Sequence, residues 1–72
     1  MKFQKIEDMR VDHDLSIKEI ASILDCHRDV YSRYEKGTRD IPVEYLIRLA
    51  KLYDCSTDYL LGISSKKRKF GD

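Results

Sequence analysis

The sequence predicts a single small domain built only of α-helices. Apolar residues recur at helical spacing in several separate segments, and no segment shows the apolar–polar alternation of a β-strand. Glycine and proline are scarce, with three Gly and one Pro in 72 residues, and each falls where a helix would begin or end. A chain of this length has room for only one hydrophobic core. We therefore expect a few helices joined by short connections.

Composition excludes several classes of protein. No apolar run approaches the roughly 20 residues that a membrane-spanning helix needs. The N-terminal stretch from Met1 to Lys5 lacks the apolar core and the small-residue cleavage site of a secretory signal, so a cytoplasmic protein is expected. The formal net charge is only +1, whereas strong non-specific DNA binders usually carry a clear basic excess. Any basic surface must therefore come from segregation of the charges.

The first helix is predicted over about residues 3–12, because apolar residues recur there at helical spacing. The run Asp12-His13-Asp14 then ends it. The residues that carry the spacing are Phe3, Ile6, Met9 and His13.

The second helix has a clear start signal at Ser16. The pattern Ser16-Ile17-Lys18-Glu19 predicts a capping box, in which the Ser16 hydroxyl accepts a hydrogen bond from the Glu19 backbone N–H. The Glu19 carboxylate in turn reaches back to the Ser16 N–H. Further along, an apolar stripe follows the i, i+3, i+4, i+7 pattern of a helix packed on one side. Its members are Ile17, Ile20, Ala21 and Leu24.

The third helix is predicted over about residues 28–36 and ends at Gly37, a residue suited to the left-handed position after a helix. On a helical wheel Tyr31 and Tyr34 share one sector and His27 projects toward the same side, so this face is expected to be buried. Only three residues, 25–27, separate the second and third helices, which is typical of a helix-turn-helix over residues 16–36. The opposite, outward face carries Arg28, Asp29, Ser32, Arg33 and Lys36.

Two more helices are predicted in the second half. The fourth follows Pro42 and has a broad apolar face, and Ser56 caps a short fifth helix that ends at Gly62. The domain is thus expected to span residues 1–63, followed by a basic and mobile tail at 64–72. The expected apolar face of the fourth helix comprises Val43, Leu46, Ile47, Leu49, Ala50 and Tyr53, and the residues expected to close the core are Tyr59, Leu60, Leu61 and Ile63.

Several linked motifs lie at matching spacings along residues 6–62. They are Leu15-Ser16, Glu19-Ile20-Ala21, Tyr31 to Gly37 and Ser56 to Gly62. With them the sequence resembles the lambda-repressor-like, Cro or Xre-type helix-turn-helix regulators of bacteria and phages. The resemblance implies a compact five-helix DNA-binding domain that places its third helix in the major groove. It also implies a homodimer, formed near the fifth helix and the loop at 38–41, on a palindromic operator.

The resemblance further implies which residues meet DNA. An arginine at 28 or 33 can bond to guanine, and Asp29 can accept from cytosine. Asp29 can instead orient Arg33, four residues further along the helix, and both alternatives stay open. The expected base-reading set is Arg28, Asp29, Ser32 and Arg33, and the expected phosphate-contacting set is Ser16, Ile17, Lys18, His27, Lys36 and Arg39.

One buried contact also follows from the resemblance. Arg10 shares the inner face of the first helix with Ile6, and in the family a matching arginine pairs with the glutamate at the position of Glu35. We therefore expect a partly buried ion pair between Arg10 and Glu35. The sequence departs from the family pattern where Asp25 replaces the usual turn glycine, where Ile17 replaces a common glutamine, and where the acidic Asp29 stands on the reading face.

Other classes of function are less well supported. A protein-interaction module or an antitoxin with weak or no DNA binding is the alternative, while no catalytic dyad or phosphate-binding glycine loop supports an enzyme. Cys26 and Cys55 lack the spacing of a zinc site, and no cofactor, metal or small-molecule ligand is expected. Four of the five tyrosines, Tyr31, Tyr34, Tyr53 and Tyr59, recur at apolar helical spacings and are interpreted as core residues. The basic run at 66–69 is either an arm along the phosphate backbone or a solvated tail.

Overall fold

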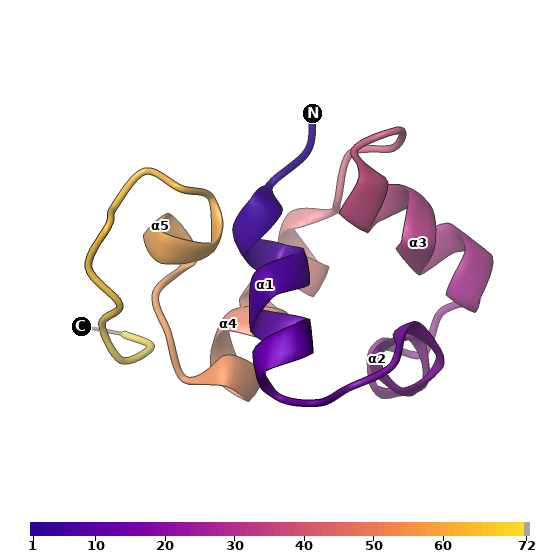
Figure 1. Cartoon of the computed structure of the whole chain (residues 1–72), viewed down its shortest axis with the longest axis horizontal. Helices are drawn as coiled ribbons and strands as arrows, with labels where there is room; N and C mark the ends of the chain where they lie inside the picture. The colour runs from indigo at the N-terminus through magenta and orange to yellow at the C-terminus, as the bar shows by residue number, and fades with distance from the viewer. Residues whose placement is uncertain (72) are drawn as a thin grey trace.

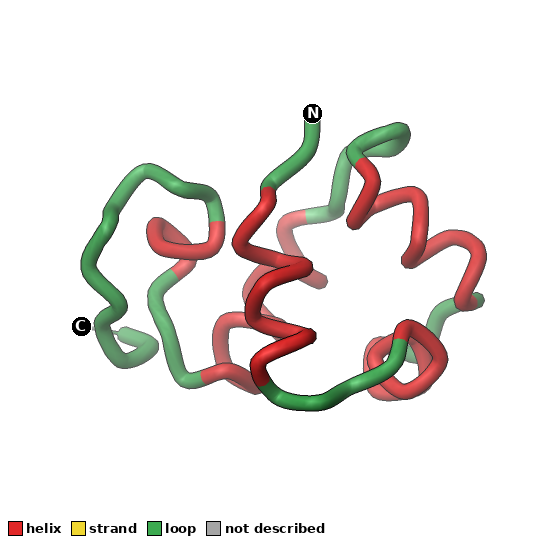
Figure 2. The backbone as a smooth tube through the Cα atoms, in the orientation of Figure 1, coloured by secondary structure: helices red, strands yellow, loops and turns green. Residues whose placement is uncertain are grey.

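The computed structural model describes residues 1–71 and contains five α-helices and no strand within them (Figures 1 and 2). Their order confirms the predicted all-α, five-helix architecture. The Cα radius of gyration is 11.1 Å, close to the roughly 11 Å expected of a compact chain of this length. None of the described helices is long and apolar enough to cross a membrane. The helices are α1 (Gln4–Asp12), α2 (Ile17–Leu24), α3 (Arg28–Lys36), α4 (Val43–Tyr53) and α5 (Thr57–Leu60).

One core draws side chains from all five helices. In Figure 1, α1 crosses the middle of the molecule, with α2 and α3 on one side and α5 on the other. Contacts between α1 and both α3 and α5 make α1 the link between the two sides. The buried apolar residues are Ile6, Met9, Ile20, Ala21, Leu24, Tyr31, Tyr34, Leu46, Leu49, Ala50, Tyr53, Cys55 and Leu60.

The prediction of the core is wrong for several apolar residues. Ile63 is 74% exposed because α5 is only four residues long and the left-handed Gly62 turns the chain away after Leu60. Along α4, Val43 and Ile47 lie one turn apart and are 69% and 37% exposed. The buried face of α4 is therefore narrower than its apolar sequence predicts. Tyr59 and Leu61 are only partly buried.

Two turns of the same construction follow α2 and α4. Each helix ends at an aspartate in the left-handed conformation, Asp25 with φ 58° and Asp54 with φ 50°. A cysteine comes next, and the following residue caps the next helix. Asp25 thus adopts the conformation that a turn glycine would adopt, as short polar side chains can. Both cysteines are free thiols.

The two ends of the chain lie against different parts of the domain. A Cβ added at Gly37 would come within 2.5 Å of the Lys2 backbone nitrogen, so the first residues pack closely against the end of α3. Near the other end, the Phe70 backbone N–H donates to Asp54 at 3.4 Å. Figure 1 shows this tail beside α5, at the end of the molecule away from α2 and α3. The mobility of the tail stays a prediction.

Candidate nucleic-acid interface

The start of α2 is held by a complete capping box. The Glu19 backbone N–H donates to Ser16 Oγ at 3.0 Å, and the Ser16 N–H donates to Glu19 Oε1 at 3.1 Å. These bonds from the Ser16 backbone and hydroxyl hold the pKa of Glu19 below its usual value. The predicted start of α2 is therefore confirmed. Ser16 and Lys18 are exposed here, whereas Ile17 is half-buried and packs against the core.

The inner face of α3 is anchored in the core. Tyr31 is fully buried and Tyr34 is 6% exposed, as the helical wheel predicts. Glu35 is 3% exposed, which is unusual for a carboxylate and requires a partner. The outward side chains of Arg28, Asp29, Arg33 and Lys36 are exposed, and Ser32 beside them is half-buried.

Arg10 is the partner of Glu35. Its Nε donates to Glu35 Oε2 and its Nη2 donates to Oε1, both at 2.9 Å, which is the bidentate geometry of a strong pair. A third bond runs from Arg10 Nη1 to the Leu15 carbonyl at 2.8 Å. The hydrogen bond and charge of Glu35 raise the pKa of Arg10. The pair joins α1 to α3, and its third bond joins α1 to the residue before the capping box.

Two tyrosine hydroxyls lie in the same part of the core. Tyr31 and Tyr53 are buried, and neither hydroxyl has a hydrogen-bond partner among residues 1–71. Burial raises the pKa of both phenols well above their usual value, and the negative charge of Glu35 raises it further. These groups therefore stay neutral beside the ion pair.

His27 caps α3 and is not part of its buried face. Its Nδ1 accepts a hydrogen bond from the Asp29 backbone N–H at 3.2 Å, and its side chain is 68% exposed. The expectation that His27 faces the core is wrong, because the capping residue lies outside the helix and does not follow its wheel. With Nδ1 accepting, the neutral ring carries its proton on Nε2. We assign this tautomer from the hydrogen bond.

Asp29 lies beside His27, not beside Arg33. Its Oδ2 is 3.7 Å from His27 Nδ1. Within the described part of the chain, no ion pair of 4 Å or less joins Asp29 to Arg33. Arg33 is therefore not held by Asp29 in this structure.

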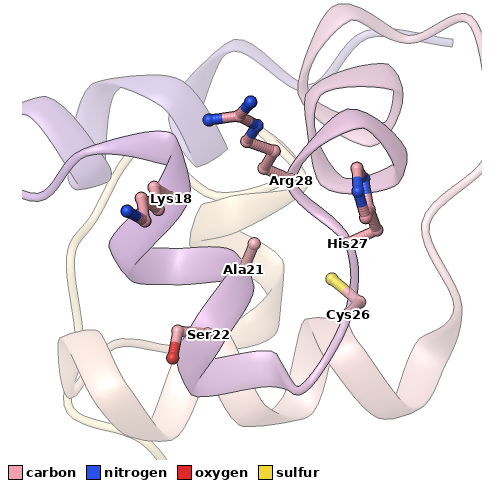
Figure 3. A pocket seen from close by; sticks show the side chains of 6 residues that line it. All are labelled: Lys18, Ala21, Ser22, Cys26, His27 and Arg28. Carbon is pink, nitrogen blue, oxygen red and sulfur yellow. The ribbon is translucent and has the colours of Figure 1, made fainter.

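A shallow depression of about 320 Å³ lies between α2 and the start of α3 (Figure 3). Lys18 on α2 and Arg28 at the start of α3 supply its charged groups, and no carboxylate lines it. Such a surface suits an anion. Burial raises the pKa of the Cys26 thiol at its edge, which keeps that group neutral. The lining residues are Lys18, Ala21, Ser22, Cys26, His27 and Arg28.

Sequence reasoning missed Arg48. On α4, its Nη2 donates to the Ile23 carbonyl at 2.7 Å and its Nη1 donates to the Leu24 carbonyl at 3.0 Å. Both carbonyls belong to the end of α2. The available signal was weak, since Arg48 is one of three charged residues on α4 and stands between the apolar Ile47 and Leu49.

Comparison with known proteins identifies the family. Residues 6–60 match the helix-turn-helix family model. The chain is 33% identical over 64 residues to the uncharacterized HTH-type transcriptional regulator YobD of Bacillus subtilis, covering 89% of this chain and 57% of YobD. It is 41% identical over 49 residues to the cryptic phage CTXphi transcriptional repressor RstR of Vibrio cholerae, covering 68% of this chain and 44% of RstR.

A third relative is also named as a transcriptional regulator of the helix-turn-helix type. The HTH-type transcriptional regulator ImmR of Bacillus subtilis is 33% identical over 66 residues, covering 92% of this chain and 52% of ImmR. The chain thus spans about half the length of the relatives that it matches. No solved structure gives a significant match. The matched model and the five-helix fold together show that this chain belongs to the lambda-repressor-like, Cro/Xre-type helix-turn-helix family of transcriptional regulators.

Proposed function

We propose that this chain binds double-stranded DNA in a sequence-specific manner and acts as a transcriptional repressor, with α3 in the major groove. The observation that carries the proposal is the two-sided character of α3. Its inner face is buried and joined to α1 by the Arg10–Glu35 pair, while its outer face is polar and exposed. A helix anchored in this way can present donors and acceptors to base edges without losing its position.

The base-reading set lies on that outer face. An arginine at 28 or 33 would donate two bonds to guanine O6 and N7, and Asp29 would accept from cytosine N4. Since no ion pair holds Arg33 to Asp29, both side chains are available to bases. Ser32 lies between them and adds one donor and acceptor. The proposed set is Arg28, Asp29, Ser32 and Arg33.

Segregated charge supports the phosphate contacts. The net charge is only +1, yet α3 and the residues just after it carry four exposed basic side chains, whereas α2 carries one lysine beside one glutamate and α1 has a net charge of −1. The depression between α2 and α3 would receive one phosphate group, with His27 in its lining as a hydrogen-bond donor. The exposed basic residues of this surface are Lys18, Arg28, Arg33, Lys36 and Arg39. The acidic residues of the first helix and the turn after it are Glu7, Asp8, Asp12 and Asp14.

Family membership supports the remaining parts of the proposal. RstR is named a transcriptional repressor, which favours repression over activation. A homodimer would present two copies of α3 to a palindromic operator, with half-sites about 34 Å apart. The dimer surface would lie near α5 and the loop at 38–41.

A salt titration tests DNA binding. Fluorescence anisotropy with a labelled duplex measures the association constant at several salt concentrations. Each neutralised phosphate contributes a slope of about −0.9 to the plot of log K against log salt, so the three cations assigned to phosphates, Lys18, Lys36 and Arg39, predict a slope of roughly −3 per protomer. A flat plot would contradict the proposal and favour the protein-interaction module.

Two single variants test which residues read bases. Arg33→Ala is expected to relax the preference at one or two base pairs, with a loss of about 1–3 kcal/mol of discrimination. Lys36→Ala is expected to weaken binding to all sequences equally. Lys51→Ala is a charge-matched control, because Lys51 lies near Phe70 of the tail, 5.6 Å from its ring. Uniform losses from Arg33→Ala would show that Arg33 contacts only the backbone.

A further inference from the structure

The end of α2 has an unusually complete set of hydrogen bonds. The last four carbonyls of a helix lack partners within the helix and need other donors. In α2 the backbone satisfies the first two of these four: Cys26 N–H donates to Ala21 at 2.9 Å and Asp25 N–H donates to Ser22 at 3.1 Å. Arg48 on α4 satisfies the last two, Ile23 and Leu24, at 2.7 and 3.0 Å. Every carbonyl of the last turn is therefore bonded.

The turn after α4 is an internal control for this arrangement. It repeats the same backbone bonds, with Cys55 N–H donating to Ala50 at 3.0 Å and Asp54 N–H donating to Lys51 at 3.3 Å. Among residues 1–71, however, no side chain donates to the last two carbonyls of α4. The aspartate–cysteine turn can therefore form without an arginine. The backbone geometry of the turn therefore does not require the two bonds that Arg48 makes to the end of α2.

The two turns differ in how deeply their cysteines are buried. Cys55 is fully buried, so its side chain anchors the second turn in the core. Cys26 is only half-buried and lines the open depression beside Lys18 and Arg28. The turn between α2 and α3 thus lies nearer the surface and has a weaker apolar anchor than its counterpart, since Cys26 packs only against the edge of the core. The two bonds from Arg48 join it to α4 instead.

We propose that Arg48 is the positioning residue of the helix-turn-helix, holding the surface turn on α4 and so setting the orientation of α2 relative to α3. The inference rests on the proposed function, because that orientation decides whether phosphate contacts from α2 and base contacts from α3 meet one duplex together. In this account Arg48 acts through α2 and not through DNA, by the bonds from its guanidinium to the two carbonyls at the end of that helix. A planar fork with several donors can span two neighbouring carbonyls, which a single ammonium does less well.

Hydrogen exchange tests the anchoring without DNA. Arg48→Met removes the donors and keeps an unbranched side chain, and Lys51→Met removes the same charge from the same helix without touching α2. In Arg48→Met, the Asp25 and Cys26 amides are expected to exchange at least tenfold faster relative to those of Asp54 and Cys55. Lys51→Met is expected to leave this ratio unchanged. Equal acceleration in both turns of Arg48→Met would mean a global loss of stability and would overturn the proposal.

DNA binding tests the consequence for recognition. On a duplex selected from a random pool, the ratio of affinities for the selected and a scrambled sequence is expected to fall at least tenfold in Arg48→Met. Arg48→Lys keeps the charge, so the affinity ratio is expected to fall less in this variant. If Arg48→Met does not fold, the test uses Arg48→Lys instead. An unchanged affinity ratio in Arg48→Met, or an equal fall of this ratio in Lys51→Met, would contradict the proposal that Arg48 positions the helix-turn-helix. If the unmodified protein binds no duplex, the proposed function fails, while the exchange ratio still decides whether Arg48 anchors the turn.

Discussion

Removal of the Arg10 guanidinium should strongly destabilise this domain. Arg10→Met leaves the Glu35 carboxylate in a site where it is 3% exposed and has lost both 2.9 Å bonds. Loss of one partner of a buried pair costs about 3–5 kcal/mol. A 72-residue domain has a total stability of only about 4–11 kcal/mol, so this loss is a large fraction of it. The expected fall in Tm is at least roughly 12 °C, at about 4–8 °C for each kcal/mol.

Circular dichroism during heating and in urea measures this loss. The surface pair Lys2–Glu7 is the matched control: its atoms are 3.7 Å apart and its side chains are 43% and 38% exposed. Glu7→Ala should therefore cost less than about 1 kcal/mol. The double variant Arg10→Met/Glu35→Leu should recover much of the loss, because replacing both charges by apolar groups removes the unpaired carboxylate. A loss below about 1 kcal/mol in Arg10→Met alone would refute the reasoning.

Three further predictions concern local structure. Gly37→Ala should cost at least about 2 kcal/mol in urea denaturation, because φ is +81° and the new Cβ would meet the Lys2 backbone at 2.5 Å; an unchanged midpoint would show that the N-terminal residues do not pack there. Ser16→Ala should cost about 1 kcal/mol through loss of the cap, against no change for the exposed Ser65→Ala; equal effects would argue against the capping box. The pKa of Glu19 is lower in the folded protein than in the unfolded chain. The ionised Glu19 carboxylate therefore stabilises the fold fully above the ordinary Glu pKa of about 4.3, and this contribution is lost as the pH falls through the pKa of the folded state. The stability gap between the unmodified protein and Glu19→Ala should therefore be constant from about pH 8 to pH 5 and shrink below about pH 4, and a gap that widens in acid would contradict this.

Local signals were enough to predict much of the fold. The capping box at Ser16, the left-handed Gly37 and the cap at Ser56 each depend on a few neighbouring residues, so α2 and α5 begin, and α3 ends, where the sequence predicts. The tyrosines at 31 and 34 point inward because their spacing fits one face of a helix. These are features that a short stretch of sequence determines by itself.

Tertiary features were harder to predict. Ile63 is apolar but exposed, since the end of α5 turns the chain away from the core. The helical wheel of α3 predicts a buried His27, but this residue precedes the helix and caps it. Arg48 acts on carbonyls 24 and 25 residues away along the chain, and no local pattern marks that contact. The ion pair of Arg10 and Glu35 was expected only through the family resemblance.

Selection of bound duplexes from a random pool tests the central claim most directly, because it reports DNA binding, base preference and symmetry together. The account predicts enrichment of one palindromic motif whose half-sites lie about 34 Å apart, centre to centre. It also predicts that the Arg33→Ala variant enriches a motif relaxed at one or two positions in each half-site. A pool that stays random after repeated rounds, with the protein folded throughout, would contradict sequence-specific recognition by α3.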